Sequence, residues 1–434
     1  MTGGALVRLS AKALTRRKSL RAAFSSAKTT FLRLMVRAKT RSLFQKIHLT
    51  IGLCFGGIFM LLGLTGSAIA WLHEIDGMLN PELLRVAQAP GVATNSPAAV
   101  TPAKVRDVLD RLTADPQYGR PTQLMLPEHA DDVFVAWYRK EFSGNASLLA
   151  MEISRQVMVN PYTLQVTGER SWGELGISRR LLMPTIFHLH RYLAAGEFGK
   201  TVIGVSGLVL LIAAITGTML WWPKPNRKAL RRALSISHRG SWTRFNHSSH
   251  RAAGFFVAPV LLVFGFSGWY FNLPKWVTPL VSSVATVSPA GKPGNRVPHG
   301  GMQISPGQAM QAAQALYSDA RISRIALPIK PSEPYEIRLR QADEIRKGDG
   351  ATRITIDAYS GEALQVRDPL RAPGGDSFLN WLFPLHSGEA FGTAGRIFIS
   401  CFGVVPLLFL VTGLGMYLKQ KNKTSTGSNA LHRP

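Results

Sequence analysis

The sequence predicts an α-helical integral membrane protein with four transmembrane helices in two helix–domain–helix repeats, which carry two small α+β extracytoplasmic domains. Three observations support this prediction. Four long runs lack charged residues, basic residues gather in three short segments, and histidines and glycines recur at equal spacings in the two halves. The net charge of +26 therefore reflects membrane topology, and we expect no nucleic-acid partner.

The four uncharged runs are long enough to cross a bilayer, because about 20 apolar residues span its hydrocarbon core as a helix. The runs are Leu49–Leu72, Thr201–Trp222, Ala252–Pro274 and Ile397–Leu418. Aromatic residues such as Trp71 and Tyr417 lie at their ends, as is typical of membrane interfaces. The first run is too long for a cleaved signal peptide, so we expect all four to lie in the lipid bilayer.

The basic segments set the expected orientation. Residues 1–46 hold 12 Lys/Arg, residues 223–246 hold 7 and residues 419–434 hold 4, and none of the three contains Asp or Glu. Positively charged loops stay in the cytoplasm, so both termini are expected there and the two long connections outside. Residues 1–40 also resemble a mitochondrial transit peptide, and Arg16-Arg17 a twin-arginine signal, but we interpret them as a basic arm on anionic lipid.

These limits divide the chain into consecutive segments. In order they are a basic cytoplasmic arm (1–46), a first span (47–73), a first external domain (74–187), a second span with an outer histidine segment (188–222), a basic cytoplasmic loop (223–246), a third span (247–272), a second external domain (273–384), a fourth span with an outer histidine segment (385–418) and a cytoplasmic tail (419–434). The second and fourth spans include a histidine that precedes the uncharged run.

The two external domains show the same order of elements. Each begins with a short amphipathic helix, at 101–114 and 305–318, and Ser305 and Pro306 suit the N-cap and first position of the second one. Strand-like stretches follow at 133–139 and 148–159 in the first domain, and at 323–328, 335–340 and 353–358 in the second. A turn at 160–163 or 357–361 then precedes a further strand, which predicts two small α+β modules.

Histidines mark the first span of each half. His48 and His250 lie at the expected cytoplasmic edge. A glycine follows each of them four residues later and another follows eighteen residues later: Gly52 and Gly66 after His48, Gly254 and Gly268 after His250. Eighteen residues are five helical turns, so each histidine shares a face with the farther glycine, which lies roughly 27 Å along the axis.

A second histidine series marks the other span of each half. His190 and His386 precede the uncharged runs, and glycines follow nine and 27 residues later: Gly199 and Gly217 after His190, Gly395 and Gly413 after His386. A small hydroxyl residue precedes the last glycine of every series: Thr65, Ser267, Thr216 and Thr412. Four histidines at matching places are hard to attribute to chance.

Imidazole is a good axial ligand for haem iron, and two imidazoles from facing helices form a six-coordinate centre suited to electron transfer. We therefore interpret the four histidines as haem ligands. The sequence has no Cys-x-x-Cys-His motif, so the haem would be b-type. Two alternatives stay open: edge histidines can reach water, and the glycines can serve close helix packing rather than leave room for planar macrocycles.

Three further histidines rank lower as ligands. His188 lies two residues before His190 and points to another side of its helix, His247 shares the face of His250, and His73 ends the first span without a partner in the other half. They are alternatives to the four matched histidines.

The position of His190 and His386 raises a geometric question. Both lie about ten residues before the uncharged runs, roughly 15 Å along a straight helix. Either their helices extend outward, or the chain bends near Gly196 and Gly388. If neither holds, His73 or His188 is the better outer ligand.

At this point the chain resembles the PepSY-associated transmembrane proteins, whose members include iron-regulated haem proteins that reduce ferric siderophores. The resemblance covers about residues 41–420 and includes the external modules, which look like PepSY domains. It rests on the motifs Arg41…His48-x3-Gly52…Leu64-Thr65-Gly66, Leu189-His190…Gly199…Thr216-Gly217…Trp221-Trp222-Pro223, His250-x3-Gly254…Gly268 and Leu385-His386-Ser387-Gly388…Thr412-Gly413.

The resemblance implies an electron conduit in a bacterial inner membrane. Two molecules of haem b would be held, one by His48 and His250 near the cytoplasmic edge and one by His190 and His386 near the outer edge. Electrons would pass outward to a ferric siderophore or similar iron complex in the periplasm, which implies a ferric (siderophore) reductase without catalytic residues beyond the haems. The sequence has no nicotinamide or flavin fingerprint, so the donor would be a quinol or a separate protein.

Two other functions compete with this one. PepSY-like modules can bind or regulate periplasmic proteins without redox chemistry, but the repeat is stricter in the spans than in the modules. A metal transporter would need charged or histidine side chains at mid-membrane, and the four uncharged runs have none.

Overall fold

The computed structural model describes residues 38–87, 98, 100–142, 149–296 and 301–430. Most of the expected basic arm, residues 1–37, lies outside the described residues. The chain forms two compact units. The first comprises residues up to 56, residues 209–262 and residues from 409 onward, and the second comprises residues 57–208 and 263–408.

Among the described residues, four helical segments are long and apolar enough to cross a membrane, which confirms the predicted number of spans and makes the chain a multi-pass membrane protein. Three of the segments are single helices: α2 (Ala38–Ile69), α7 (Gly196–Trp221) and α9 (Trp242–Asn272). The fourth consists mainly of α13 (Gly392–Phe402) and α14 (Val405–Ala430). Since lipid offers the backbone no hydrogen-bond partners, long uncharged runs satisfy their own amides by folding as helices.

In the first unit, polar and aromatic contacts join the helices. Trp221 of α7 stacks on Phe255 of α9, with ring centroids 3.9 Å apart. The side-chain amide of Asn246 in α9 donates a hydrogen bond to the carbonyl of Thr412 in α14 (2.8 Å). The short helix α8 (Arg227–Leu234) is tied to α7, because the indole nitrogen of Trp221 donates to the carbonyl of Ala233.

In the second unit, glycines bring helix backbones together. A methyl group on Gly63 of α2 would overlap the carbonyl oxygen of Gly403, which lies between α13 and α14. A methyl group on Gly207 of α7 would lie 2.5 Å from the backbone nitrogen of Trp269 in α9. Close helix packing thus uses Gly63, Gly207 and Gly403, and Gly207 packs against Gly268 of the histidine-linked glycine series.

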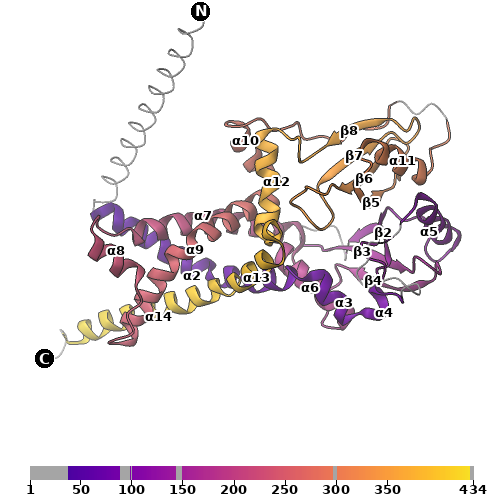
Figure 1. The fold of residues 1–434 in the computed structure, drawn as a ribbon. Coiled ribbons are helices and arrows are strands. Elements are labelled where there is room, and N and C mark those ends of the chain that lie inside the picture. Colours follow the sequence, from indigo (N-terminus) through magenta and orange to yellow (C-terminus); the bar gives the residue numbers. More distant parts are fainter. Residues whose placement is uncertain (1–37, 88–97, 99, 143–148, 297–300, 431–434) are drawn as a thin grey trace, which may run out of the picture. The chain divides into compact units, whose positions relative to one another are not determined.

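The segments between the spans form one eight-stranded antiparallel sheet, which lies entirely in the second unit (Figure 1). The first segment supplies β1 (Gln123–Met125), β2 (Phe134–Phe142), β3 (Glu152–Val159) and β4 (Val166–Trp172). The second supplies β5 (Arg321–Ala326), β6 (Tyr335–Arg340), β7 (Thr352–Ile356) and β8 (Ala363–Arg367). The strand order is β4-β3-β2-β1-β5-β6-β7-β8, so the pairing of β1 with β5 joins the two segments.

The two modules expected from the sequence are therefore halves of one sheet. Their helices, α5 (Pro102–Ala114) and α11 (Pro306–Leu316), lie where the sequence predicts them and pack against each other. Ser305 forms the expected N-cap of α11, in a reciprocal capping box with Gln308. The strand predictions miss β1, which has only three residues.

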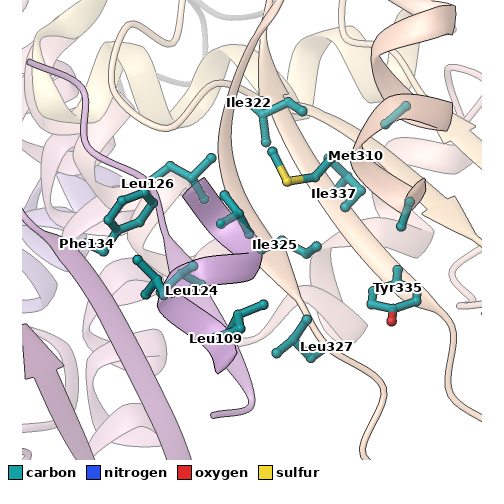
Figure 2. Packing of buried hydrophobic residues seen from close by; sticks show 14 of the residues in the cluster. Leu109, Leu124, Leu126, Phe134, Met310, Ile322, Ile325, Leu327, Tyr335 and Ile337 are labelled. Carbon is teal, nitrogen blue, oxygen red and sulfur yellow. The ribbon is translucent and has the colours of Figure 1, made fainter. Parts of the chain in front are cut away.

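One hydrophobic core spans the junction between the two halves of the sheet. Figure 2 shows Leu109 of α5 and Leu124 of β1 packed with Met310 of α11, Ile325 of β5 and Ile337 of β6. The side chains of Leu124, Ile325 and Ile337 are fully buried. Burial of each such side chain stabilises the fold by about 1.5–3 kcal/mol, so the two halves depend on a shared core.

Shorter helices connect the sheet with the spans. They are α3 (Leu72–Leu79), α4 (Pro81–Leu84), α6 (Arg179–Tyr192), α10 (Pro274–Ser282), α12 (Gly374–Ser387) and the 3-10 turn η1 (Glu389–Phe391). A buried ion pair anchors α3 to the sheet, because Arg170 of β4 donates to both carboxylate oxygens of Asp76 at 2.7 and 3.0 Å. Helices α6 and α12 carry His190 and His386.

Candidate functional site

The first histidine pair consists of His48 on α2 and His250 on α9, both in the first unit. Their ring centroids lie 6.4 Å apart, and the ring planes are perpendicular. Both helices begin before the uncharged runs, so the two histidines lie inside long helices rather than at helix ends. The sequence predicted both residues as ligands, and the fold brings their rings next to each other.

Each histidine of this pair is held through its Nδ1 atom by another helix. His48 Nδ1 donates to the carbonyl of Ala213 (3.1 Å) and lies 3.2 Å from Thr216 Oγ1, both on α7. His250 Nδ1 lies 2.8 Å from Thr412 Oγ1 on α14. A carbonyl only accepts hydrogen bonds, so the proton of His48 sits on Nδ1 and leaves Nε2 as a free lone pair.

The second histidine pair consists of His190 on α6 and His386 on α12, both in the second unit. Their ring centroids are also 6.4 Å apart, with the planes at 73°. His190 Nδ1 lies 3.1 Å from Thr65 Oγ1 on α2, and His386 Nδ1 lies 2.6 Å from Ser267 Oγ on α9. The same arrangement of facing rings and Nδ1–hydroxyl contacts therefore occurs in both units.

The four hydroxyl groups act as acceptors toward the histidines. Thr65, Thr216 and Ser267 each donate their hydroxyl proton to a backbone carbonyl four residues earlier, at 2.6–2.8 Å. Thr412 donates to the carbonyl of Phe409, three residues earlier. Because each hydroxyl proton is engaged, the oxygen accepts from Nδ1–H, and this fixes the tautomer with an unprotonated Nε2.

Two of the glycines that follow the hydroxyl residues, Gly66 and Gly217, make room for a histidine ring. A methyl group on Gly66 would lie 3.0 Å from Cε1 of His190, and one on Gly217 would lie 2.9 Å from Cε1 of His48. On Gly413 it would lie 3.9 Å from Cε1 of His250, an ordinary contact. We call the four units Thr65-Gly66, Thr216-Gly217, Ser267-Gly268 and Thr412-Gly413 hydroxyl–glycine pairs. The sequence showed that these pairs recur. It did not predict that they contact the histidines.

Two tight bends bring His190 and His386 to these positions. Helix α6 ends at Tyr192, and Leu193, Ala194 and Gly196 all have positive φ angles (47°, 52° and 52°) before α7 continues. Helix α12 ends before Gly388, whose φ is 83°. Of the geometries open from the sequence, the chain therefore adopts the bends near Gly196 and Gly388.

Gly199 and Gly395 stabilise those bends. A methyl group on Gly199 would overlap the carbonyl oxygen of Tyr192, and one on Gly395 would overlap that of Gly388. Each glycine thus allows the start of a span to touch the end of the preceding helix. The glycine nine residues after each outer histidine therefore allows a bend and does not serve contact between two spans.

The second pair lies in an apolar environment. The ring of Phe264 lies 5.1 Å and that of Phe271 5.6 Å from the ring of His386. Burial lowers the pKa of His190 to about 4, and burial together with the neighbouring His190 lowers the pKa of His386 to about 3. Both imidazoles are therefore neutral near pH 7, which is the form that binds metals.

The spacing of both pairs fits two ligands on opposite sides of one metal ion. A bond from a metal to an imidazole nitrogen is about 2 Å long, and that nitrogen lies roughly 1.2 Å from its ring centroid. Two imidazoles on one iron would thus have centroids about 6.4 Å apart, which agrees with the observed 6.4 Å. Within the described ranges, no third His, Cys, Asp or Glu completes a metal site. The pairs suit a metal that brings its other ligands with it.

Open space beside the first pair agrees with this interpretation. Gly52 and Gly254 lie one helical turn after His48 and His250, and a methyl group on either would meet no atom within 4 Å. The two glycines therefore leave the surface beside each ring clear. This is what a flat macrocycle bound edge-on between the helices requires.

The lower-ranked histidines are not part of either pair. His188 Nδ1 bonds to the carbonyl of Pro184 in its own helix at 2.8 Å, and its ring stacks on Tyr192. His73 and His247 are exposed. Among the histidines of the described residues, the ring contacts between two histidines are those of His48 with His250 and of His190 with His386, and the ranking of the four as ligands stays a prediction.

Curated proteins and protein-family models were compared with this chain. A search of curated proteins found no match. The family model described as "PepSY-associated TM region" matches residues 45–420, nearly the whole chain and all four spans. The matched range contains both histidine pairs and all four hydroxyl–glycine pairs. The chain is thus a multi-pass membrane protein that belongs to the PepSY-associated TM region family.

Proposed function

We propose that this protein holds two b-type haems, one at each histidine pair, and transfers electrons across the membrane to a ferric complex. The observation that carries the proposal is the twofold occurrence of facing histidines with engaged Nδ1 atoms at a centroid distance of 6.4 Å. Haem b, when bound, supplies one-electron transfer. The protein supplies the ligands, their orientation and an apolar surrounding.

The chain's own residues have three tasks in this function. His48, His250, His190 and His386 present Nε2 as the ligand atom. The hydroxyl–glycine pairs hold the rings and keep the Nδ1 proton in place, and such support from a second residue typically strengthens metal binding 10–100-fold. Gly52 and Gly254 keep the space next to the first pair clear.

The same proposal includes a duplicated architecture. Each hydroxyl–glycine pair contacts a histidine of its own half. In the first half, α2 contacts His190 and α7 contacts His48. In the second half, α9 contacts His386 and α14 contacts His250. Each histidine pair then joins one residue from each half. We infer two TM–PepSY–TM repeats, with the sheet formed by their external domains.

The proposed orientation of the chain in the membrane follows from charge. The basic segments place both termini and α8 in the cytoplasm of a bacterial inner membrane, and the sheet in the periplasm. A quinol or a separate protein gives the electrons. A ferric siderophore or similar complex accepts one electron per iron, and the resulting Fe(II) binds its chelator more weakly and is released for uptake.

The test is a reduced-minus-oxidised absorption spectrum of purified protein together with its haem-to-protein ratio. We expect a low-spin b-type spectrum, and we expect His48→Ala and His386→Ala each to remove about half of the haem, because they belong to different pairs. His247→Ala, an exposed histidine three residues from His250, is the control and should keep all of it. A well-folded preparation without haem contradicts the proposal.

A further inference from the structure

A row of four arginines crosses the second half of the sheet. Arg324 of β5 lies opposite Arg338 of β6, Arg338 lies opposite Arg353 of β7, and Arg353 lies opposite Arg367 of β8. Directly opposite residues in an antiparallel sheet share a face, and like charges there are destabilising. We call Arg324, Arg338, Arg353 and Arg367 the arginine row.

The sheet itself does not require these charges. The same row continues into the first half as Met125, Val135, Met158 and Gly168 on β1 to β4. The two halves share strand order and helix position, yet only the second half has positively charged residues at the positions of this row. A row of arginines that costs stability therefore calls for a functional explanation.

Neighbouring carboxylates neutralise only part of the row. Asp349 forms ion pairs with both Arg324 and Arg338. Arg367 uses its guanidinium on the backbone carbonyls of Pro289 and Gly291, at 3.1 Å each. Among the described residues, Arg353 has neither an ion pair nor a side-chain hydrogen bond, and its side chain is only partly buried.

Guanidinium nitrogen atoms without a hydrogen-bond partner also indicate that the arginine row is only partly neutralised. The Nε atoms of Arg324 and Arg338, and both Nε and Nη1 of the adjacent Arg321, are buried without a hydrogen-bond partner among the described residues. Burial, with the like charges of Arg353, Arg324 and Arg346, lowers the pKa of Arg338 to about 9. Both facts indicate a lack of negative charge, which a bound anion would supply.

The row lies close to the helix that carries a histidine of the second pair. The guanidinium of Arg346, whose charge acts on Arg338 and Arg353, stacks over the ring of Phe383 on α12 at 4.2 Å. Phe383 lies three residues before His386. Phe271 bridges the two, with ring centroids 6.1 Å from Phe383 and 5.6 Å from His386.

We propose that the arginine row, with Arg346, binds the anionic oxygen atoms of the ferric complex, so that the substrates of this protein are negatively charged ferric chelates with carboxylate or catecholate groups. This inference rests on the proposed function for the identity of the ligand, but not for the existence of the anion site. Arginine suits the task because its planar donors match carboxylates and other paired oxygens.

The carboxylates of a haem could also supply anionic oxygen atoms to the arginine row. The length of the row argues against them. Neighbouring strands lie about 4.8 Å apart, so four arginines cover roughly 14 Å. A haem carries only two carboxylates on one edge. A compact chelate with several anionic groups can engage more of the row.

The experiment measures binding without electron transfer. Gallium(III) citrate is a close substitute for ferric citrate that the haems cannot reduce, and a neutral gallium trihydroxamate is the uncharged comparison. Binding of both to the full-length protein in detergent is measured by equilibrium dialysis, for the native chain and for Arg353→Gln, Arg338→Gln and Arg296→Gln. Arg296 lies in the same half and pairs with Glu362 at the surface, so its variant removes one charge without touching the row.

We expect gallium citrate, and not the neutral complex, to bind the native chain. Arg353→Gln and Arg338→Gln should each weaken this binding roughly tenfold, and Arg296→Gln should not change it. Arg353→Gln is the decisive variant, since the loss of a partly exposed arginine without an ion pair leaves the fold intact. Equal binding of the two complexes, or unchanged affinity in Arg353→Gln, overturns the proposal.

The haem content of the same samples separates the two proposals. If the native chain binds gallium citrate but contains no haem, the electron-transfer function fails and the anion site stands. If the native chain binds no gallium citrate and the row variants lose haem, the arginines hold haem carboxylates, and the proposed substrate site is wrong.

Discussion

The four histidines depend on residues of other helices for their position and tautomer. His48 and Thr216 are 168 residues apart in sequence, and His386 and Ser267 are 119 apart. Each hydroxyl donates its own proton to a carbonyl of its helix and accepts the Nδ1 proton, so the direction of the hydrogen bond is settled before any ligand binds. The protein thus prepares Nε2 as a donor atom in both units.

If the first histidine pair holds haem as proposed, removal of one hydroxyl should weaken haem binding at that pair alone. Thr216→Val keeps the shape of the side chain but takes away one of the two acceptors of His48 Nδ1, since the carbonyl of Ala213 remains, and we expect haem affinity at that site to fall about tenfold. Haem titration followed by absorption, with midpoint potentials, measures this. Thr218→Val is the matched control, because Thr218 bonds only to the carbonyl of Ala214 in its own helix. Equal losses in the two variants would contradict the role of Thr216.

A methyl group in the open space beside His48 should compete with haem but not with the fold. Gly52→Ala meets no protein atom within 4 Å, so thermal stability should be unchanged while haem at the first pair is reduced. Gly57→Ala is equally free of contacts but lies half a turn away from the face of His48, and it should retain haem. Full haem occupancy in Gly52→Ala would show that the macrocycle does not use this space.

Sequence spacing was enough to select the four histidines, because equal intervals in two halves are visible along the chain. It could not assign the hydroxyl–glycine pairs to their histidines, since those contacts join distant helices. The sequence alone allows two interpretations of the eight glycines: close helix packing, or room for a macrocycle. The structure divides them: Gly66 and Gly217 lie under histidine rings, Gly199 and Gly395 allow bends, and Gly52 and Gly254 border open space. Only the partner atoms distinguish these uses.

At the scale of elements, the bends before α7 and α13 decide where the second pair lies. His190 and His386 are on helices separate from the spans that follow them, and the chain turns back so that each ring meets a span of its own half. Left-handed conformations at Leu193 and Ala194 cost roughly 1 kcal/mol each, and the close contact of Gly199 with Tyr192 holds them.

Gly199→Ala should therefore disturb the second pair and spare the first. Its methyl group overlaps the carbonyl oxygen of Tyr192, so α6 must move and carry His190 away from Thr65. We expect about half of the haem to be lost, with the remaining spectrum equal to that of His190→Ala. A full complement of haem in Gly199→Ala would mean that the bend is not what positions His190.

Element types were predictable where the chain is periodic or uncharged. The long spans, α5, α11 and β6 lie close to the predicted positions. β1 was missed because three residues are too few to show alternation, and its identity as a strand comes from its neighbours β2 and β5. The fusion of two modules into one sheet was missed for the same reason, since β1 is the strand that makes the junction.

At the scale of the molecule, the continuous sheet predicts that both external segments unfold together. Ile325 of β5 is fully buried in the core shared by the two halves, and truncation to alanine should cost roughly 2–5 kcal/mol. Thermal unfolding of the full-length protein in detergent should then show one transition at lower temperature. Ile329→Ala, at a side chain that is 59% exposed, should leave the midpoint unchanged. Two separate transitions, with only one shifted, would contradict a common sheet.

The antiparallel β1–β5 junction has a further consequence. A chain with only one half would hold one histidine of each pair and an open β1 edge, and it could complete both only as a symmetric homodimer. In the proposed duplicated architecture, the chain corresponds to two such subunits joined in one polypeptide, so that their sequences can differ. One row of directly opposite residues crosses the whole sheet. It consists of Met125, Val135 and Met158 in the first half and of Arg324, Arg338 and Arg353 in the second. A homodimer of identical subunits could not have this difference between its halves.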